Sequence, residues 1–345
     1  MKRKRWLLSL ALICVLGMVE VGYTKESPMV LRLAHFAPPK GLFATFLNKA
    51  VGEVEQLTEG RIKIEVYWSE SLLKSKEMLR GVEKGICSIA FIAIGYYPSE
   101  LPLNNVQVNV LYSPKARDAG WVARKAWEVM DGNKELYDEF TKYAQAPWFV
   151  TPYDGYCVFS KKLIEGCSDI KGMRIRITSD GQAKFLAAVG GIPIWIAAAD
   201  TYVGLQKGAV DGALATIEYG KRYGYHEVTR FVAETYLSTN YTVITASLRD
   251  LEKMTKKDRE VFLEVGRRVS IEYGDAMKKE VNDNKALIEK AGVRIVPFPA
   301  EELHKWLKTA AAQKVQKDWI EEQNKAGRPG TKIMESFIKI FEVPQ

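Results

Sequence analysis

Two arginines on one short segment are the residues best placed to do chemistry in this chain. Arg174 and Arg176 alternate with apolar residues over residues 173–178 (MRIRIT), a pattern that predicts a strand with both arginines on one face. A helix is predicted to follow Gly181, and the unpaired N–H groups at the start of a helix favour an anion. Ligands of open α/β sheets bind beyond the C-terminal ends of strands, which is where Arg176 falls. An anion would be favoured at this position, but from these residues alone the pairing of Arg176 with a neighbouring Asp or Glu is the preferred interpretation.

Residue patterns that support catalysis are missing from the sequence. It contains no GxSxG, HExxH or GxGxxG motif and no phosphate-binding GxxxxGKS or GxxxxGKT motif. The three histidines, His35, His226 and His304, lie on different segments without the spacing of metal ligands. We therefore expect no metal, no cofactor, no ATP site and no enzyme, the only alternative being a nucleophile pair of Cys157 with a distant histidine.

The elements that must position Arg176 alternate between strands and helices. Predicted strands cover residues 30–36, 61–68, 87–94, 148–153, 156–160, 173–178, 192–196 and 241–247. Predicted helices cover residues 43–57, 74–83, 117–144 with a break near 131–132, 182–189, 201–207, 256–291 and most of 301–341. Strands that alternate with helices indicate an α/β fold with mainly parallel sheets covered on both faces.

The length of the chain indicates two domains. About 320 residues follow the N-terminal segment described below, which is too many for one typical core. We place lobe 1 at residues 28–146 plus about 243–290, and lobe 2 at residues 147–242 plus about 291–345. The helix predicted over residues 256–291 is long enough to span both lobes.

The N-terminus is typical of a secretory signal peptide. Basic residues at positions 2–5 precede an apolar run over residues 6–19, and this run is shorter than the roughly 20 apolar residues that a membrane-spanning helix needs. We predict a signal peptide over residues 1–24 with cleavage near residues 22–24. Its removal takes away four basic residues and one acidic residue and leaves 46 Lys and Arg against 41 Asp and Glu. Because these charges are interleaved, we expect no nucleic-acid partner.

Three cysteines, Cys87, Cys157 and Cys167, would remain after cleavage. An exported protein reaches an oxidising compartment, where at most one disulfide can form from three cysteines. The spacing of Cys157 and Cys167 matches no metal or CxxC redox pattern. A disulfide between these two residues stays open.

Residues 169–212 (DIKGMRIRITSDGQAKFLAAVGGIPIWIAAADTYVGLQKGAVDG) carry the most specific signature in the chain. A basic strand, a helix, a turn with a proline and an LQxGxVDG ending follow one another in this segment. The residues that match this pattern are Lys171, Gly172, Arg174, Arg176, Pro193, Asp200, Tyr202, Leu205, Gln206, Gly208, Val210, Asp211 and Gly212. In these residues the chain resembles the solute-binding proteins of tripartite ATP-independent periplasmic (TRAP) transporters, of the dicarboxylate-binding-protein-like kind. Residues 31–39 (LRLAHFAPP) and 60–67 (GRIKIEVY) extend the resemblance over nearly the whole chain.

The resemblance implies a two-lobed periplasmic binding protein of the type II, Venus-flytrap kind. Such a protein captures a small organic acid and delivers it to a membrane permease with a small and a large integral subunit. The arginine that matches Arg176 is implied to bind the solute's carboxylate through two hydrogen bonds, which a planar guanidinium suits. Arg174 is expected to be partly solvated, and Gly208 to cap a helix. The alternatives are a binding protein of another importer or sensor system, and an exported enzyme on the same fold.

Three polar positions that are common in the family carry apolar residues here. The position of a second basic residue falls on or near Cys157, that of a polar residue falls near Ala93, and that of an Asn after the VDG motif falls in residues 213–215 (ALA). An unpaired buried polar group costs about 1–3 kcal/mol, so apolar walls select against a solute with many polar groups.

Aromatic residues near the predicted cleft indicate instead a monocarboxylate with an apolar or aromatic body. The candidate ligand-binding residues beside Arg176 are Phe36, Tyr96, Tyr153, Tyr156, Trp195, Tyr202 and Tyr219. For each aromatic side chain the alternative is packing in the core. His35, at the end of the first predicted strand, is a further candidate that either hydrogen-bonds the solute or caps its loop.

Overall fold

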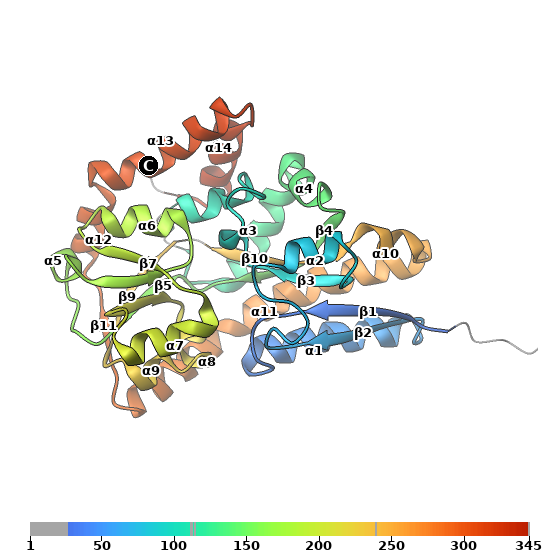
Figure 1. The fold of residues 1–345 in the computed structure, drawn as a ribbon, viewed down its shortest axis with the longest axis horizontal. Helices are drawn as coiled ribbons and strands as arrows, with labels where there is room; N and C mark the ends of the chain where they lie inside the picture. Colours follow the sequence, from blue (N-terminus) through green and yellow to red (C-terminus); the bar gives the residue numbers. More distant parts are fainter. Residues whose placement is uncertain (1–26, 111–112, 114, 239, 344–345) are drawn as a thin grey trace, which may run out of the picture.

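Two β-sheets organise the protein, whose residues 27–110, 113, 115–238 and 240–343 are described by a computed structural model (Figure 1). The strand order is β2-β1-β3-β10-β4 in the first sheet and β11-β9-β5-β8-β6-β7 in the second. β1 runs parallel to β2 and β3, and β6 runs parallel to β7 and β8. β10 and β5 run antiparallel to their neighbours. The structure thus confirms the predicted α/β class and adds antiparallel strands to both sheets.

The elements follow one another in two long stretches of the chain. The first stretch contains β1 (Met29–Ala34), α1 (Gly41–Leu57), β2 (Ile62–Tyr67), α2 (Met78–Glu83), β3 (Ile89–Ile92), the 3₁₀ helices η1 (Ile94–Tyr96) and η2 (Asn104–Asn109), α3 (Ala119–Asp131), α4 (Lys134–Thr141) and β4 (Gln145–Pro152). The second contains β5 (Tyr156–Ser160), α5 (Cys167–Ile170), β6 (Arg174–Ile177), α6 (Asp180–Ala187), β7 (Ile192–Trp195), α7 (Ala198–Lys207), β8 (Gly212–Ala215), α8 (Ile217–Arg222), α9 (Tyr225–Val228) and β9 (Phe231–Leu237). The chain then continues through β10 (Tyr241–Ser247), α10 (Leu248–Lys253), α11 (Lys256–Lys290), β11 (Arg294–Pro297), α12 (Ala300–Leu307), α13 (Ala310–Lys325) and α14 (Gly330–Ile340).

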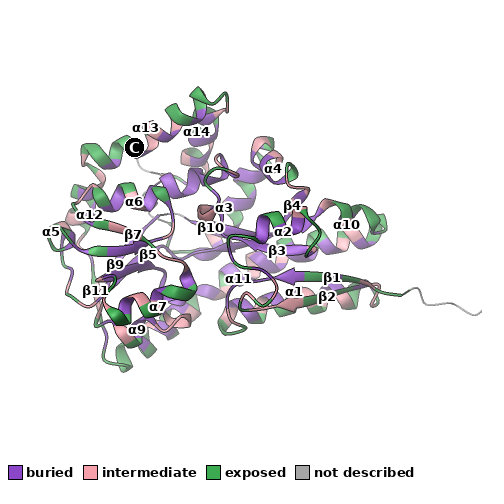
Figure 2. Ribbon diagram, in the orientation of Figure 1, coloured by how far each residue is buried: buried purple, intermediate pink, exposed green. Residues whose placement is uncertain are grey.

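Local hydrophobic patterns explain why these elements form. In α1 the buried residues Phe43, Leu47, Ala50 and Val54 recur at helical spacing. β3 is buried along its whole length, as expected for a strand covered on both faces. Figure 2 shows buried residues along the strands of both sheets and on the inward sides of the helices. Burial of these apolar faces drives the assembly of both lobes.

The long helix α11 joins the two lobes, as the sequence predicts. It packs against α1, α3 and β4 of the first sheet's layer and against α8 and β11 of the second, and in Figure 1 it extends from the first sheet towards β11 in the second. Two further connections cross between the sheets, from β4 to β5 and from β9 to β10. These two crossings pair with each other, since the Tyr153 N–H donates to the Asn240 carbonyl at 3.0 Å.

Sheet membership places two elements differently from the lobe boundaries expected from the sequence. β4 begins at Gln145 and pairs with β10 in the first sheet, although the boundary was set at residue 147. On α14, Ile333 and Phe337 are buried in the core of the first sheet, although residues 291–345 were assigned to lobe 2. Hydrophobic periodicity marks a buried face without naming its partner. We propose that lobe 1 contains β4 and α14 and that lobe 2 begins at β5.

Several local expectations also need correction. The helix expected over residues 74–83 begins only at Met78, and the strand expected over 87–94 ends at Ile92, where η1 takes over. The strands β9 and β11 were missed. The signal peptide predicted over residues 1–24 lies outside the described residues.

The cysteines and the helices allow two further statements about the described part of the chain. Cys87, Cys157 and Cys167 are free thiols, so the possible disulfide between Cys157 and Cys167 is not formed. No helix between residue 27 and residue 343, gaps excepted, is both long and apolar enough to cross a bilayer.

Candidate functional site

Arg176 lies on β6 with its side chain completely buried. Its Nε–H donates to the Ile196 carbonyl at 3.0 Å and its Nη1–H donates to the Leu214 carbonyl at 3.1 Å. Its Nη2 is buried and has no hydrogen-bond partner within the described residues. No described carboxylate lies within salt-bridge distance of it, so the alternative of a pairing with Asp or Glu finds no support in this part of the chain.

A buried guanidinium of this kind needs an acceptor. Arginine keeps its positive charge in proteins, and a buried charge without a partner is costly. The two carbonyls neutralise none of this charge, and Nη2 has no acceptor among the described residues. The arrangement favours an anion with an oxygen close to Nη2.

The cavity at Arg176 is lined by residues of both lobes and of the crossing strands. Its walls consist of Phe36, Ala93, Gly95, Tyr96, Val108, Tyr153, Tyr156, Arg176, Thr178, Tyr219, Asn240 and Thr242. Arg176, Phe36, Tyr96, Tyr153, Tyr156 and Tyr219, all singled out from the sequence, therefore meet in one place. Ala93, the position at which a polar residue was missing, also belongs to the wall.

Flat aromatic faces dominate this cavity. The rings of Phe36 and Tyr96 are stacked, with an interplanar angle of 19° and centroids 6.3 Å apart, and Tyr153 and Tyr156 meet edge to face at 6.0 Å. Burial raises the pKa of the Tyr96, Tyr153, Tyr156 and Tyr219 hydroxyls above the usual tyrosine value. These hydroxyls are therefore neutral at physiological pH, and Arg176 is the charged group of the cavity wall.

Three polar residues of this wall are not predicted from the sequence. Thr178 follows β6 directly, and Asn240 and Thr242 flank the start of β10. The Asn240 amide donates to the Tyr156 hydroxyl at 3.4 Å, and the Thr242 hydroxyl lies 3.4 Å from that of Tyr153. Only the position of Thr178, two residues after Arg176 at the strand end, signals its role in the sequence.

The structure does not bring His35 into the cavity. Its Nδ1 accepts the Ala37 N–H at 2.8 Å, and its ring packs among Phe36, Phe43, Trp68 and Phe91 at centroid distances of 4.5–5.5 Å. Burial, and to a lesser degree the charge of Arg222, holds its pKa well below the usual value. Of the two expected roles, the contacts show the loop cap.

Trp195 and Tyr202 lie outside the Arg176 cavity as well. Trp195 ends β7 and is 37% exposed, with its ring 5.1 Å from that of Tyr96. Tyr202 on α7 lines a different and larger cavity.

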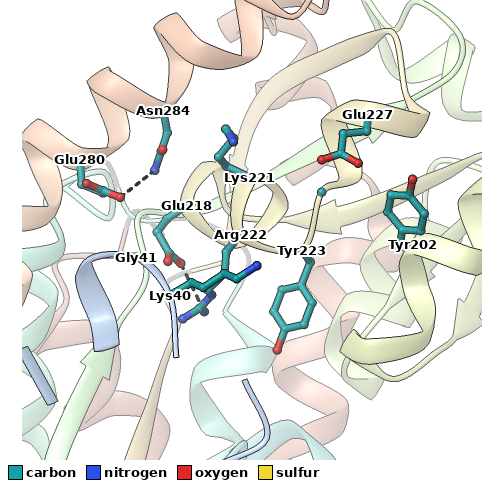
Figure 3. Close-up of a pocket in the computed structure, with 11 residues that line it drawn as sticks. Lys40, Gly41, Tyr202, Glu218, Lys221, Arg222, Tyr223, Glu227, Glu280 and Asn284 are labelled. Atoms are coloured by element: carbon teal, nitrogen blue, oxygen red, sulfur yellow. Dashed lines mark hydrogen bonds and ion pairs between the residues drawn. The ribbon is translucent and has the colours of Figure 1, made fainter. Parts of the chain in front are cut away.

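That larger cavity, of about 560 Å³, lies beside α8 (Figure 3). Its walls carry positive and negative groups in equal number: Lys40, Lys221, Arg222, Glu218, Glu227 and Glu280. Arg222 is buried and pairs with Glu218 at 3.4 Å, and the Asn284 amide donates to Glu280 at 3.3 Å. Arg222 has a carboxylate partner in Glu218, although its Nε and Nη1 are buried without a hydrogen-bond partner among the described residues. Because Arg176 has no carboxylate partner in this part of the chain, we propose the smaller cavity at Arg176 as the solute site.

Arg222 is a second basic residue near the cleft, whereas the position at which the family commonly carries one falls on or near Cys157 here. Cys157 is fully buried in a core cluster, and its neighbour Tyr156 faces the Arg176 cavity instead. The second buried arginine comes from α8, four residues after Glu218. This spacing within one helix turn is the sequence signal that would have revealed the pair.

The remaining signature residues hold β6 in place. Arg174 points outward and binds Asp211 at 2.9 Å, and it donates to the Gly208 carbonyl at 2.9 Å. Gly208 ends α7 in the left-handed conformation with φ +74°, as expected for a helix C-cap. Among the described residues no cluster of His, Cys, Asp and Glu has the arrangement of a metal site.

Comparisons with known proteins agree on one family. A family model described as bacterial extracellular solute-binding protein, family 7 (DctP), matches residues 33–322. A solute-binding protein of Albidiferax ferrireducens is 24% identical over 262 residues, covering 74% of this chain and 75% of the relative. The sialic acid-binding periplasmic protein SiaP of Vibrio cholerae is 21% identical over 246 residues, covering 70% and 74%.

Solved structures show the same fold. A TRAP solute-binding protein of Rhodoferax ferrireducens in complex with copurified benzoate has a TM-score of 0.82 at 21% identity, covering 91% of this chain and 98% of that one. A marine metagenome TRAP protein specific for aromatic acid ligands, in complex with metahydroxyphenylacetate, has a TM-score of 0.81 at 19% identity, covering 92% and 99%. The receptor DctP7 of Bordetella pertussis, which binds pyroglutamic acid, has a TM-score of 0.78 at 18% identity, covering 90% and 99%.

Proposed function

The chain belongs to the bacterial extracellular solute-binding protein family 7, that of the TRAP transporters, and we propose that it captures a small monocarboxylate with a flat, apolar or aromatic body. One observation carries this proposal: the buried Arg176 guanidinium has a free Nη2 and no carboxylate partner within the described residues. The solute carboxylate would accept hydrogen bonds from Arg176, and its body would lie between the aromatic walls.

The composition of the cavity wall supports the class of solute. With one fixed positive charge and mostly aromatic or small apolar neighbours, the wall matches the chemistry of one carboxylate and one ring, and the present cavity of about 30 Å³ must widen to admit such a solute. Neighbouring structures hold benzoate, metahydroxyphenylacetate and pyroglutamate, and others hold glucuronate or galacturonate. The hydroxyl-rich sugar acids need many hydrogen-bonding partners, whereas in this wall Asn240 and Thr242 already contact the Tyr156 and Tyr153 hydroxyls. We therefore favour the ring acids.

A ligand screen tests the proposal directly. Thermal unfolding of the mature protein is followed with benzoate, 3-hydroxyphenylacetate, pyroglutamate and D-glucuronate. A ligand at 100 times its dissociation constant stabilises by about 2.7 kcal/mol, which gives a clear rise in Tm. We expect at least one ring acid to raise Tm more than D-glucuronate does; a response to the sugar acid alone would contradict the proposed solute class.

Membership of the family also defines the partners that we propose. Members are periplasmic receptors rather than enzymes, so capture without turnover is the expected activity. We propose that the chain is exported by the signal peptide over residues 1–24 and delivers its solute to a permease with a small and a large membrane subunit. Permease genes of this type beside its gene would support this assignment; an ATPase gene in their place, or turnover of the bound acid, would contradict it.

A further inference from the structure

A four-residue segment of lobe 2 links the Arg176 site to lobe 1. It begins at Trp195, whose strand β7 pairs with β6 so that Trp195 lies opposite Ile177. The carbonyl of the next residue, Ile196, accepts the Arg176 Nε–H at 3.0 Å. Two residues later, the Ala198 N–H donates to the hydroxyl of Tyr96 at 3.3 Å. The segment over residues 195–198 therefore contacts both Arg176 and Tyr96, and Tyr96 comes from lobe 1.

Two side chains of lobe 1 contact Trp195 at the start of this segment. The ring of Tyr96 lies 5.1 Å from the ring of Trp195. Lys76, on the exposed loop before α2, places its Nζ 3.7 Å from the centroid of the Trp195 ring. This distance is well inside the range of a favourable cation–π contact, and indole is the best aromatic partner for it. Trp195 is 37% exposed and contacts both of these lobe 1 side chains.

These contacts exist only when the two lobes meet. Lys76 and Tyr96 belong to lobe 1, and Trp195 belongs to lobe 2. Separation of the lobes breaks the cation–π contact, the ring contact and the Ala198–Tyr96 hydrogen bond together. Stabilisation of the closed form by contacts that are absent from the open form slows opening, and it leaves the first encounter with the solute unaffected.

We propose that Lys76 and Trp195 form a clasp that positions Tyr96 against the Arg176 site and sets the residence time of the bound solute. Lys76 and Trp195 are positioning residues, since they act through Tyr96 and do not line the cavity. The inference rests on the proposed solute site at Arg176. It gives Trp195 a role different from the ligand contact expected from the sequence.

Stopped-flow fluorescence with the ring acid that raises Tm most separates the association and dissociation rates. For Lys76→Met, which keeps the side-chain length and removes the charge, we expect dissociation two- to fivefold faster with association unchanged, the loss expected for one exposed cation–π contact. Lys76→Arg keeps a cation over the indole and should restore the slow dissociation. Equal dissociation rates for wild type and Lys76→Met would overturn the clasp.

Lys74→Met is the matched control for this measurement. Lys74 lies on the same loop, is exposed and pairs with Glu70 at 3.3 Å within lobe 1. Its removal takes away the same charge without touching the interface, so both rates should stay at their wild-type values. Faster dissociation in Lys74→Met, equal to that of Lys76→Met, would mean that the loop's charge and not the clasp controls the rate, and would also overturn the proposal.

A measurement without solute keeps the clasp testable if no acid binds. Spin labels at the exposed positions Lys84 in lobe 1 and Lys207 in lobe 2 report the distance between the lobes, with Cys167→Ser as background. We expect a smaller fraction of Lys76→Met molecules to show the short distance between the two labels, compared with the wild type and with Lys74→Met. Identical distributions would overturn the clasp, whereas failure of every acid in the thermal screen would overturn the proposed function alone.

Discussion

Arg176 is the charged side chain in the wall of its cavity. It is buried on β6, held by two carbonyls and flanked by hydroxyls that burial keeps neutral. A carboxylate that enters this site meets a guanidinium whose desolvation already occurred during folding. Such preorganisation reduces the free energy that binding itself must supply.

Replacement of Arg176 tests this residue. In Arg176→Gln the carboxylate loses its charged partner, and we expect binding of the best ring acid to weaken by about 2–5 kcal/mol in isothermal titration calorimetry. Arg174→Gln, on the exposed side of the same strand, should retain wild-type affinity. Unchanged affinity in Arg176→Gln would remove this residue from the site.

Asp154 is a second buried charge centre, on the crossing between β4 and β5. Asp154 is 2% exposed, and neither of its carboxylate oxygens has a hydrogen-bond partner within the described residues. Burial, with a smaller contribution from the charge of Glu218, raises its pKa from 3.8 to about 7. The folded protein therefore keeps a proton on Asp154 between about pH 4 and pH 7, where the unfolded chain has released it.

The raised pKa of Asp154 fixes the sign of a pH effect on stability. Protonated Asp154 contributes fully to the free energy of unfolding below about pH 4. This contribution is lost as the pH rises through about 7, which lowers the free energy of unfolding by on the order of 4 kcal/mol. We expect Asp154→Asn, which cannot ionise, to remove this decline in urea unfolding measured from pH 5 to pH 8. An equally steep decline in Asp154→Asn would assign the effect to other groups, and exposed Asp180→Asn is the control.

At the scale of elements, α6 and η2 approach each other at the edge of the solute cavity. A Cβ atom at Gly181 on α6 would lie 1.8 Å from the Val108 carbonyl oxygen of η2. Val108 lines the cavity, and so does Thr178, three residues before Gly181. Gly181 therefore permits a backbone-to-backbone contact that helps to set the width of the site.

Gly181→Ala tests this contact. The clash involves backbone atoms that no side-chain rotation can relieve, so α6 must move away from η2, and we expect the solute affinity to fall by about 1–3 kcal/mol. Gly52→Ala on α1 is the matched control, since nothing lies within 4 Å of its Cβ. It should leave affinity unchanged and raise stability by about 0.5–1 kcal/mol through helix propensity. Wild-type affinity in Gly181→Ala would show that this contact does not shape the site.

At the scale of the whole molecule, the cavity exists because two lobes meet over α11. Its walls combine Phe36 and Tyr96 of lobe 1 with Arg176 and Tyr219 of lobe 2, and the paired crossings supply Tyr153 and Asn240. A solute that contacts both lobes favours the closed arrangement, because it gains contacts that the open one lacks.

Small-angle scattering measures this closure. We expect the radius of gyration of the wild-type protein to decrease when the ring acid is added, because solute contacts to both lobes shift the population towards the closed form. Arg176→Gln at the same acid concentration should show no decrease. An unchanged radius in the saturated wild-type protein would contradict hinge closure on binding.

Local pattern determined much of the site on its own. Alternation over residues 173–178 placed Ile175 and Ile177 in a core and Arg176 on the opposite face, and the family resemblance implied a ligand role for Arg176, which stays a prediction. Gly208 was identified as a helix cap for the same reason, because backbone conformation and side-chain alternation depend on near neighbours in the chain. The α/β class and the long helix α11 followed from periodicity.

Only the tertiary structure decided what faces those side chains. Asn240 and Thr242 reach the Arg176 cavity because the start of β10 lies beside residues 153–155. Arg222 lines the other, larger cavity, where α8 packs against α11. β4 joined the first sheet and α14 the first core through partners distant in sequence. Periodicity shows which face of an element is buried, but its partner depends on the free energy of the whole assembly. The clasp of Lys76 and Trp195 could be found only in the folded protein for this reason.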